Sequence, residues 1–431
     1  TLFRSINDEA LLCEIGIAEI QVELGNYESA LNELDKVKKS LVSGNHQQDL
    51  IFAKTISAIG WIVFRKAKYQ ESLKIQEEAL HIMKKLGLEN QMVSLPIYFR
   101  LVKALFYLAK YKEMKDLLDY VKRMIEENYG KDHFELVEVH NNYGLYYYEI
   151  SEYTNSEKTL SENLKLALKS FGEIHSKVSI IYRYLGTLGM VQGDLKNSLT
   201  NFQKAYDINT QIYGRNHIET ITLLDNIGYW HIKNGDFSLA EQVLKEALVF
   251  KIKFFGNTCH PSLAKSYDRL AWLTSNQGRY HDCVKYYEKS LKIVMECYGR
   301  NHPDTASILS SLGSAYSDIE DYTKALAFQK EALAVRESYF GPNHIEVSWC
   351  YNELGILYGR IRDFEKSLEN YKKAHKIGKA WFGKDHIEVA DTYGNVACAY
   401  DDLGQSEKAL RKFQKEMDIK VKAFGENHIR L

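Results

Sequence analysis

Proline and cysteine are both scarce in this chain of 431 residues. Three of its four prolines fall in loops or at a helix start, where proline is tolerated, and no Gly/Ser-rich linker divides the chain. The six cysteines include no Cys-x-x-Cys pair, a spacing common in zinc and redox sites. We therefore expect one continuous domain with buried, reduced thiols, as in a cytoplasmic protein.

An excess of either charge is also missing, since 56 basic and 57 acidic residues leave a net charge of −1. This balance argues against attraction of the whole surface to nucleic acid or anionic lipid. No apolar run reaches about 18 residues, so we expect no membrane span. The common catalytic motifs Gly-x-x-x-x-Gly-Lys, His-Glu-x-x-His and Gly-x-Ser-x-Gly do not occur.

What the sequence does contain is a short loop that recurs at an almost fixed interval. An aromatic residue followed by glycine returns every 42 residues, with one interval of 43. A period in this range indicates an array of structural repeats. The glycines of the loop are Gly130, Gly172, Gly214, Gly256, Gly299, Gly341, Gly383 and Gly425.

The unit between His302 and Tyr339 shows what one repeat is. Its two halves each carry apolar residues at intervals of three and four, the pattern of an amphipathic helix, with a polar turn between them. We expect a helical hairpin, with Gly341 in the αL position after the second helix and with Asn343 or Asp304 capping the next helix. A lone hairpin cannot bury both faces, so neighbouring units must stack.

Small residues recur in register at two positions of each unit. They let paired helices approach at the short end of the usual 8–10 Å range. The first small position holds Ala18, Gly60, Val102, Gly144, Gly186, Gly228, Ala271, Gly313, Gly355 and Ala397. The second holds Ala30, Ser72, Met114, Ser156, Ser198, Ala240, Cys283, Ala325, Ser367 and Ala409.

Taken together, these motifs resemble the tetratricopeptide repeat (TPR). Leu312-Gly313-x-x-Tyr316, Tyr322-x-x-Ala325 and Ala332 match its signature, which HEAT and armadillo arrays lack. The longer period and the (Tyr/Phe)-Gly-x-x-His linker resemble the kinesin light chain and nephrocystin-3-like subfamily. The resemblance implies an all-α, right-handed superhelical solenoid of about ten repeats. We expect units at about 1–45, 46–88, 89–131, 132–173, 174–215, 216–258, 259–300, 301–342, 343–384 and 385–427, all within a single domain, 1–431.

The ends of the chain fall inside the pattern. Residue Thr1 is not an initiator methionine, and no signal-peptide pattern follows it. Residues 428–431 begin a further unit. We therefore expect the parent protein to continue, and exposed end units to allow self-association.

The loop histidines invite a metal-site interpretation, which their spacing opposes. Successive copies should lie roughly 10 Å apart along the array, whereas metal ligands converge at about 2 Å. We expect them to bond to backbone at helix starts. Cys259-His260 lacks the third group that orients a nucleophile and its base. We predict no enzyme activity, cofactor or metal. The histidines are His133, His175, His217, His260, His302, His344, His386 and His428.

Binding in such arrays typically uses the concave face lined by the first helix of each unit. We predict a peptide-binding groove, with a solvated polar face as the alternative. Its middle is basic and aromatic, which favours an acidic peptide. The resemblance to kinesin light chains implies acidic, tryptophan-containing segments and a backbone-binding role for the asparagine two before the small residue. The predicted groove residues are Asn142, Arg183, Asn226, Tyr229, Lys233, Lys265, Arg269, Trp272 and Asn395.

The function predicted is that of a scaffold or adaptor for protein or peptide partners. A second interpretation is the sensing region of a larger signalling protein that carries a nucleotide-switch or effector domain. The 30 tyrosines could also stack on single-stranded nucleic acid, but the balanced charge favours core packing for them.

Overall fold

The computed structural model describes residues 6–23, 26–44, 46, 49–66, 68–108, 110–255 and 260–424, and its regular elements are all helices. The all-α class and the helix-turn-helix unit predicted from the sequence are confirmed. In these ranges no helix is both long enough and apolar enough to cross a bilayer. Residues 256–259, including Cys259, and residues 425–431, including His428, lie outside the described part of the chain.

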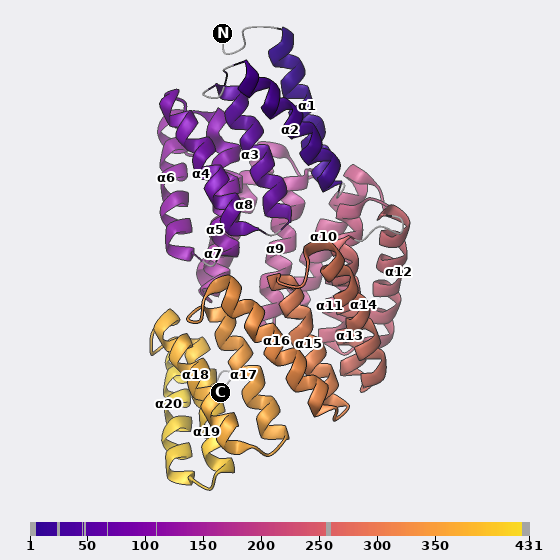
Figure 1. Cartoon of the computed structure of the whole chain (residues 1–431), viewed down its shortest axis with the longest axis vertical. Coiled ribbons are helices and arrows are strands. Elements are labelled where there is room, and N and C mark those ends of the chain that lie inside the picture. Colours follow the sequence, from indigo (N-terminus) through magenta and orange to yellow (C-terminus); the bar gives the residue numbers. More distant parts are fainter. Residues whose placement is uncertain are drawn as a thin grey trace. The chain divides into compact units, whose positions relative to one another are not determined.

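The N-terminal segment, Thr1–Asn226, is one of two compact units into which the chain divides. Consecutive helices pack against each other as hairpins (Figure 1), and α7 also packs against α9. Its helices are α1 (Ile6–Glu23), α2 (Tyr27–Ser43), α3 (Leu50–Arg65), α4 (Tyr69–Lys85), the 3₁₀ helix η1 (Met92–Ser94), α5 (Leu95–Tyr107), α6 (Tyr111–Tyr129), α7 (Leu136–Glu149), α8 (Tyr153–Phe171), α9 (Ser176–Gln192), α10 (Leu195–Tyr213) and the start of α11 (Ile218–Asn234).

The C-terminal segment, Ile227–Leu431, repeats the same hairpin with more regular lengths. The first helices of neighbouring repeats also meet, as α15 does with α17. Its helices are the end of α11, α12 (Phe237–Phe255), α13 (Pro261–Asn276), α14 (Tyr280–Tyr298), α15 (Pro303–Asp318), α16 (Tyr322–Phe340), α17 (Ile345–Arg360), α18 (Phe364–Phe382), α19 (Ile387–Asp402) and α20 (Ser406–Phe424). The single domain 1–431 and its ten unit boundaries stay a prediction.

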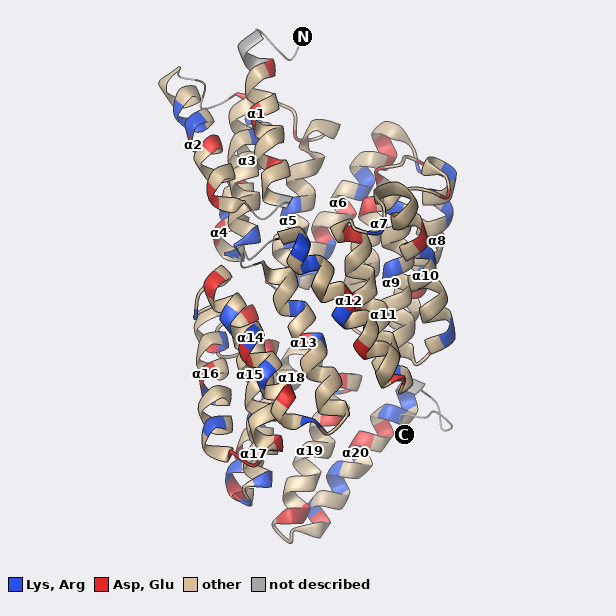
Figure 2. Ribbon diagram, turned by 90° about the vertical axis from the view of Figure 1, so that its right-hand side faces the viewer, with Lys and Arg blue, Asp and Glu red and all other residues tan. Residues whose placement is uncertain are grey.

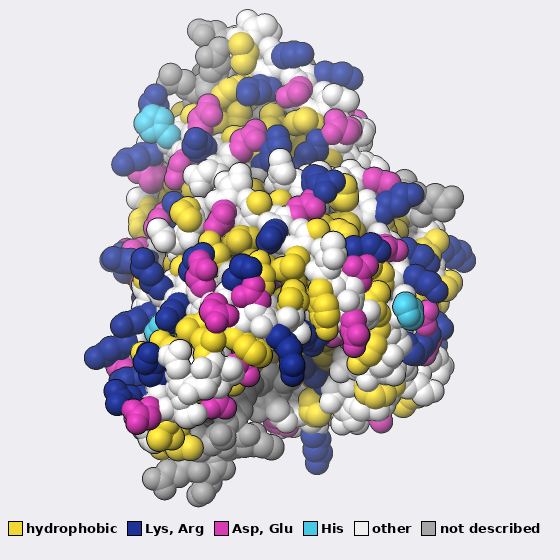
Figure 3. Space-filling view, turned by 60° about the horizontal axis from the view of Figure 1, so that its bottom comes forward, with side chains coloured by type: hydrophobic (Ala, Val, Ile, Leu, Met, Phe, Trp, Pro, Cys, Tyr) yellow, Lys and Arg dark blue, Asp and Glu magenta, His cyan; other side chains and the backbone are white. Residues whose placement is uncertain are grey.

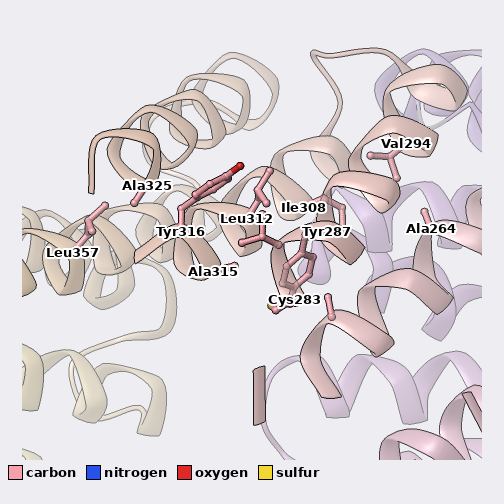
Figure 4. Close-up of a cluster of buried hydrophobic side chains, with 12 residues drawn as sticks. Ala264, Cys283, Tyr287, Val294, Ile308, Leu312, Ala315, Tyr316, Ala325 and Leu357 are labelled. Carbon is pink, nitrogen blue, oxygen red and sulfur yellow. The ribbon is translucent and has the colours of Figure 1, made fainter. Parts of the chain in front are cut away.

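The core of a repeat lies between the two helices of a hairpin and the next first helix. In the cluster drawn in Figure 4, Cys283 and Tyr287 of α14 face Ile308, Leu312 and other buried residues of α15. All these side chains are at least nine-tenths buried. Stacking of hairpins therefore supplies the burial that a single hairpin lacks.

The two small positions allow close contact inside each hairpin. A Cβ added to Gly186 would lie 2.7 Å from the ring of Phe202, so only glycine fits without displacing that ring. The serine at the second position adds a hydrogen bond that was not predicted: the Ser198 hydroxyl donates to the Gly186 carbonyl at 2.6 Å. The same bond recurs between Ser156 and Gly144, at 2.8 Å, and in the repeats of Ser72 and Ser367.

The linker between repeats corrects two expectations. Gly341 has a positive φ of 89°, but its ψ of 158° is extended, so the predicted αL conformation is wrong. This region is essentially restricted to glycine, and it directs the chain away from α16 toward the next helix. The predicted capping by Asn343 or Asp304 is also wrong, because His344 and His302 are the N-cap residues.

The loop histidines cap helices in a consistent way. Nδ1 of His302 accepts the backbone N–H of Asp304 at 2.9 Å, and its ring stacks on Tyr298 with centroids 4.4 Å apart. Burial lowers the pKa of His302 and so favours the neutral ring that this cap requires. The expectation that these histidines bond to backbone at helix starts is confirmed for His302 and His344.

Cysteines are less uniformly buried than expected. Cys283 and Cys350 are buried, and Cys283 occupies the second small position of its repeat. Cys13 and Cys398 are exposed, so the expectation of buried thiols is wrong for these two.

Candidate functional site

Four of the predicted groove residues come together in the C-terminal segment. Tyr229 and Lys233 lie on α11, one turn apart, and Arg269 and Trp272 lie on the neighbouring first helix, α13. The rings of Tyr229 and Trp272 have centroids 5.0 Å apart and are tilted by 41°. We call these four residues the basic aromatic surface.

Two cations rest on these two rings. Cζ of Arg269 lies 4.1 Å from the centroid of the Tyr229 ring. Nζ of Lys233 lies 4.8 Å from the centroid of the Trp272 ring. Each contact stabilises the arrangement by about 0.5–1 kcal/mol at a partly exposed site. The rings therefore hold both positive charges in place without neutralising them.

The charges of this surface stay available to a partner. Among the described residues, no carboxylate forms an ion pair with Lys233 or Arg269. Lys265, one turn before Arg269 on α13, is exposed and adds a second positive charge to that helix. The neighbouring Asp268 is half-buried, and burial raises the pKa of its carboxyl group, while Arg269 and Lys265 oppose that shift. The exposed charges of Lys233 and Lys265 are thus accessible to an anionic group of a partner.

The predicted asparagines lie in more enclosed positions than expected. Asn142 is only 5% exposed, and its amide donates to the Glu138 carbonyl one turn earlier at 2.8 Å. Asn395 is half-buried and donates to the side-chain oxygen of Asn352 on the adjacent first helix at 2.6 Å.

The remaining two predicted residues lie in the N-terminal segment. Arg183 on α9 is half-buried, and its Cζ lies 4.8 Å from the centroid of the adjacent Tyr184 ring. Asn226 is half-buried on α11, one turn before Tyr229.

A hollow that the sequence did not reveal lies beside the basic aromatic surface. It has a volume of about 380 Å³, and Trp272 forms part of its lining together with Trp349, Glu353 and serines of α15. The serines at 307, 310, 311 and 314 share one helix face, and this spacing is the signal that could have located the hollow.

Charge elsewhere on the surface is mixed. Basic and acidic residues occur on nearly every labelled helix in Figure 2, and the two kinds are interspersed on the face shown in Figure 3. Within the described ranges no three His, Cys, Asp or Glu side chains converge in a group that could hold a metal ion.

A family model described as tetratricopeptide repeat matches residues 177–248, 262–338, 304–380 and 360–420, together more than half of the chain. The chain belongs to the tetratricopeptide repeat family. The family prediction made from the repeat signature is therefore confirmed. The matched ranges of this TPR protein include all four residues of the basic aromatic surface.

Curated relatives of the TPR protein are much longer than the part they share with it. They include the clustered mitochondria protein homologues of Emericella nidulans, 26% identical over 167 residues, and of Aspergillus niger, 24% identical over 166 residues. The match covers 38% of this chain and 13% of each relative. The chain thus corresponds to a small part of the length of these relatives.

Two solved structures illustrate the similarity of this chain to known structures. A Rap protein complexed with competence and sporulation factor has a TM-score of 0.57 at 15% identity, with 86% of this chain and 98% of that chain covered. A putative kinesin light chain of Podosopora anserina has a TM-score of 0.42 at 18% identity, with 49% and 99% covered. At 15% identity the likeness to the Rap protein concerns the fold alone.

Proposed function

We propose that this TPR array is a non-catalytic binding module that holds an acidic segment of a partner protein on the basic aromatic surface. The observation that carries the proposal is the pair of unneutralised cations, Lys233 and Arg269, held on the rings of Tyr229 and Trp272. The module acts as a scaffold or adaptor in the cytoplasm and needs no cofactor, nucleic acid or membrane.

The chemistry of the surface defines the partner that it would hold. Carboxylates of the partner meet the two cations, and an apolar or aromatic side chain covers the exposed edges of Tyr229 and Trp272. Because cation–π contacts already restrain Lys233 and Arg269, less side-chain entropy is lost when an anion binds. An extended segment suits the surface, since it can present alternate side chains to successive first helices.

The test is a selection from a random-sequence peptide library displayed on phage. The full chain is compared with the charge-reversed variant Lys233→Glu/Arg269→Glu. A matched control, Lys292→Glu/Lys330→Glu, makes the same change in net charge at exposed lysines on the second helices α14 and α16.

We expect the wild-type chain and the control to enrich peptides that combine aspartate or glutamate with an aromatic residue. Binding of these peptides to Lys233→Glu/Arg269→Glu should be at least about tenfold weaker, because two attractions become repulsions of about 1 kcal/mol each. Equal enrichment on all three proteins, or enrichment of no peptide, would overturn the proposal.

The other interpretation of the sequence, a sensing region within a larger signalling protein, stays a prediction. In that interpretation the same array senses a ligand or a protein on behalf of an attached nucleotide-switch or effector domain. Stacking of end repeats between two copies of the chain is likewise still a prediction, which sedimentation equilibrium would test.

A further inference from the structure

The hollow beside Trp272 is built from five consecutive helices of the C-terminal segment. Its walls include Trp272 of α13 and Trp349 of α17, and its volume is about 380 Å³. Trp349 is 48% exposed although it is a large aromatic side chain. Cys283, Tyr287 and Ala315, labelled in Figure 4, belong both to this lining and to the core beneath it.

Small polar side chains of α15 make the floor of the hollow. Ser310 donates to Oε1 of Gln329 at 2.9 Å, and Nε2 of Gln329 donates back to the Ser310 carbonyl at 2.9 Å. Nε2 of Gln329 also lies 3.3 Å from the hydroxyl of Ser314. These bonds restrain the serine side chains, which line the hollow together with the two tryptophans.

The charges around the hollow are paired except for one. Arg336 forms an ion pair with Glu346 at 3.2 Å. Asp318 is paired with Arg360 at 2.6 Å. Glu353 forms no ion pair with any described residue, and its Oε2 accepts a hydrogen bond from the Ser314 hydroxyl at 3.2 Å. Glu353 is therefore the carboxylate of this lining that has no ion-pair partner among the described residues, although Arg336 and Arg360 are near enough to lower its pKa in opposition to burial.

The surroundings of the carboxylate favour a positively charged guest. Burial raises the pKa of the Glu353 carboxyl group, so a cation that reached it would recover part of the lost solvation. Burial, together with the carboxylates Asp318 and Asp268, raises the pKa of the Cys283 thiol at the edge of the hollow to about 12. The shift at Cys283 thus includes an effect of nearby carboxylates, whereas the shift at Glu353 is due to burial.

We propose that this hollow receives the guanidinium group of an arginine side chain in the bound partner segment, with Glu353 as its anionic acceptor and Trp272 and Trp349 as its stacking walls. The inference rests on the proposed function, since it names a second side chain of the same segment. A guanidinium carries five N–H donors in a plane, which suits a carboxylate, nearby hydroxyl oxygens and aromatic faces at once.

The position of the hollow also predicts how far apart the arginine and the acidic residues stand in the partner segment. Trp272 borders both the basic aromatic surface and the hollow, and adjacent first helices lie roughly 10 Å apart. An extended chain covers that distance in about three residues. The arginine should therefore stand about three residues from the acidic residues that meet Lys233 and Arg269.

The test uses ¹⁹F NMR on the full chain labelled with 5-fluorotryptophan, because the sequence has five tryptophans. The probe is N-acetyl-arginine N-methylamide, and the matched neutral probe is the citrulline derivative. Arginine should shift the resonances of Trp272 and Trp349 but not those of Trp61 or Trp381. Citrulline should bind at least about tenfold more weakly, since it lacks the charge that strengthens the hydrogen bond.

Two variants complete the design. Glu353→Gln should weaken arginine binding at least about tenfold, whereas Glu365→Gln, at an exposed position on α18, should leave it unchanged. Equal binding of arginine and citrulline, unchanged binding by Glu353→Gln, or equal shifts at Trp61 and Trp381 would overturn the inference. If the arginine test fails but the phage selection still enriches acidic peptides, this inference is overturned and the proposed function stands. If the phage selection enriches no acidic peptides, the proposed function itself is overturned.

Discussion

Replacing Gly172 by asparagine should destabilise the protein more than the same replacement of Gly193. Gly172 ends α8 with φ 77° and ψ −178°, and Gly193 ends α9 with φ 81° and ψ 6°. Asparagine enters the αL region of Gly193 at little cost, but the region of Gly172 is essentially restricted to glycine. A Cβ at either position would meet no atom within 4 Å, so backbone conformation alone separates the two substitutions.

The size of the effect follows from these backbone angles. A non-glycine residue held in the region of Gly172 costs about 1–3 kcal/mol, and that cost should appear for both Gly172→Ala and Gly172→Asn. Gly193→Ala should cost about 1–2 kcal/mol. Gly193→Asn should recover most of that cost, because Asn is a common αL residue after a helix.

Hydrogen exchange of the amides in α8 and α9, followed by mass spectrometry on the full chain, is the suitable assay. It measures the free energy of local opening, which matters because repeat arrays need not unfold in one step. Equal losses for Gly172→Asn and Gly193→Asn, within about 0.5 kcal/mol, would refute the reasoning from φ and ψ.

Three further predictions concern the repeat. Burial lowers the folded-state pKa of His302, so the stability from its cap on the Asp304 N–H is present above about pH 6.5 and is lost as pH falls toward the lowered pKa. The melting temperature of the wild type should therefore exceed that of His302→Asn by less at pH 5 than at pH 7.5. A difference that stays constant over this pH range would contradict the prediction. Ser198→Ala, which removes the bond to the Gly186 carbonyl, should cost about 1 kcal/mol in thermal unfolding, and an unchanged Tm would show that the bond contributes nothing. Glu320→Gly should raise the free energy of unfolding by up to about 1 kcal/mol, because Glu320 has a positive φ of 63° that glycine adopts without strain. Urea denaturation measures this free energy, and a decrease would contradict the prediction.

The repeat could be predicted from sequence because its constraints are local and periodic. A fixed interval, two helical stripes and small residues such as Gly186 and Ser198 each report a contact inside one hairpin. The turn inside each hairpin holds a further periodic feature, a residue with positive φ, which was not predicted. The position of Glu320 in its repeat is occupied by glycine in four others, at Gly193, Gly235, Gly278 and Gly404. Because other repeats have a non-glycine residue there, the glycine periodicity is incomplete.

Features that depend on ψ or on contacts between repeats could not be predicted in this way. A glycine after a helix indicates a positive φ, but nothing in the sequence distinguishes the extended ψ of Gly341 from αL. The bond of His302 to backbone at a helix start was predicted, but the N-cap position was assigned to Asp304 because aspartate is the more usual capping residue type. Asn142 was expected at the surface, yet helix packing encloses it and its amide bonds within its own helix.

The hollow shows the same limit for the candidate site. Tyr229, Lys233, Arg269 and Trp272 could be selected because each occupies a known register position on a first helix. Glu353 and Trp349 belong to a different repeat from Trp272, and only the three-dimensional stacking of α13, α15 and α17 places them around one cavity.

The most direct test of the central claim is isothermal titration of a blocked peptide that contains aspartates around a tryptophan. We predict binding to the full chain that weakens with added salt, at least about tenfold weaker binding to Lys233→Glu/Arg269→Glu, and no change for Lys292→Glu/Lys330→Glu. Equal affinity for the wild-type chain and the Lys233→Glu/Arg269→Glu variant would contradict the claim that the basic aromatic surface binds acidic partner segments.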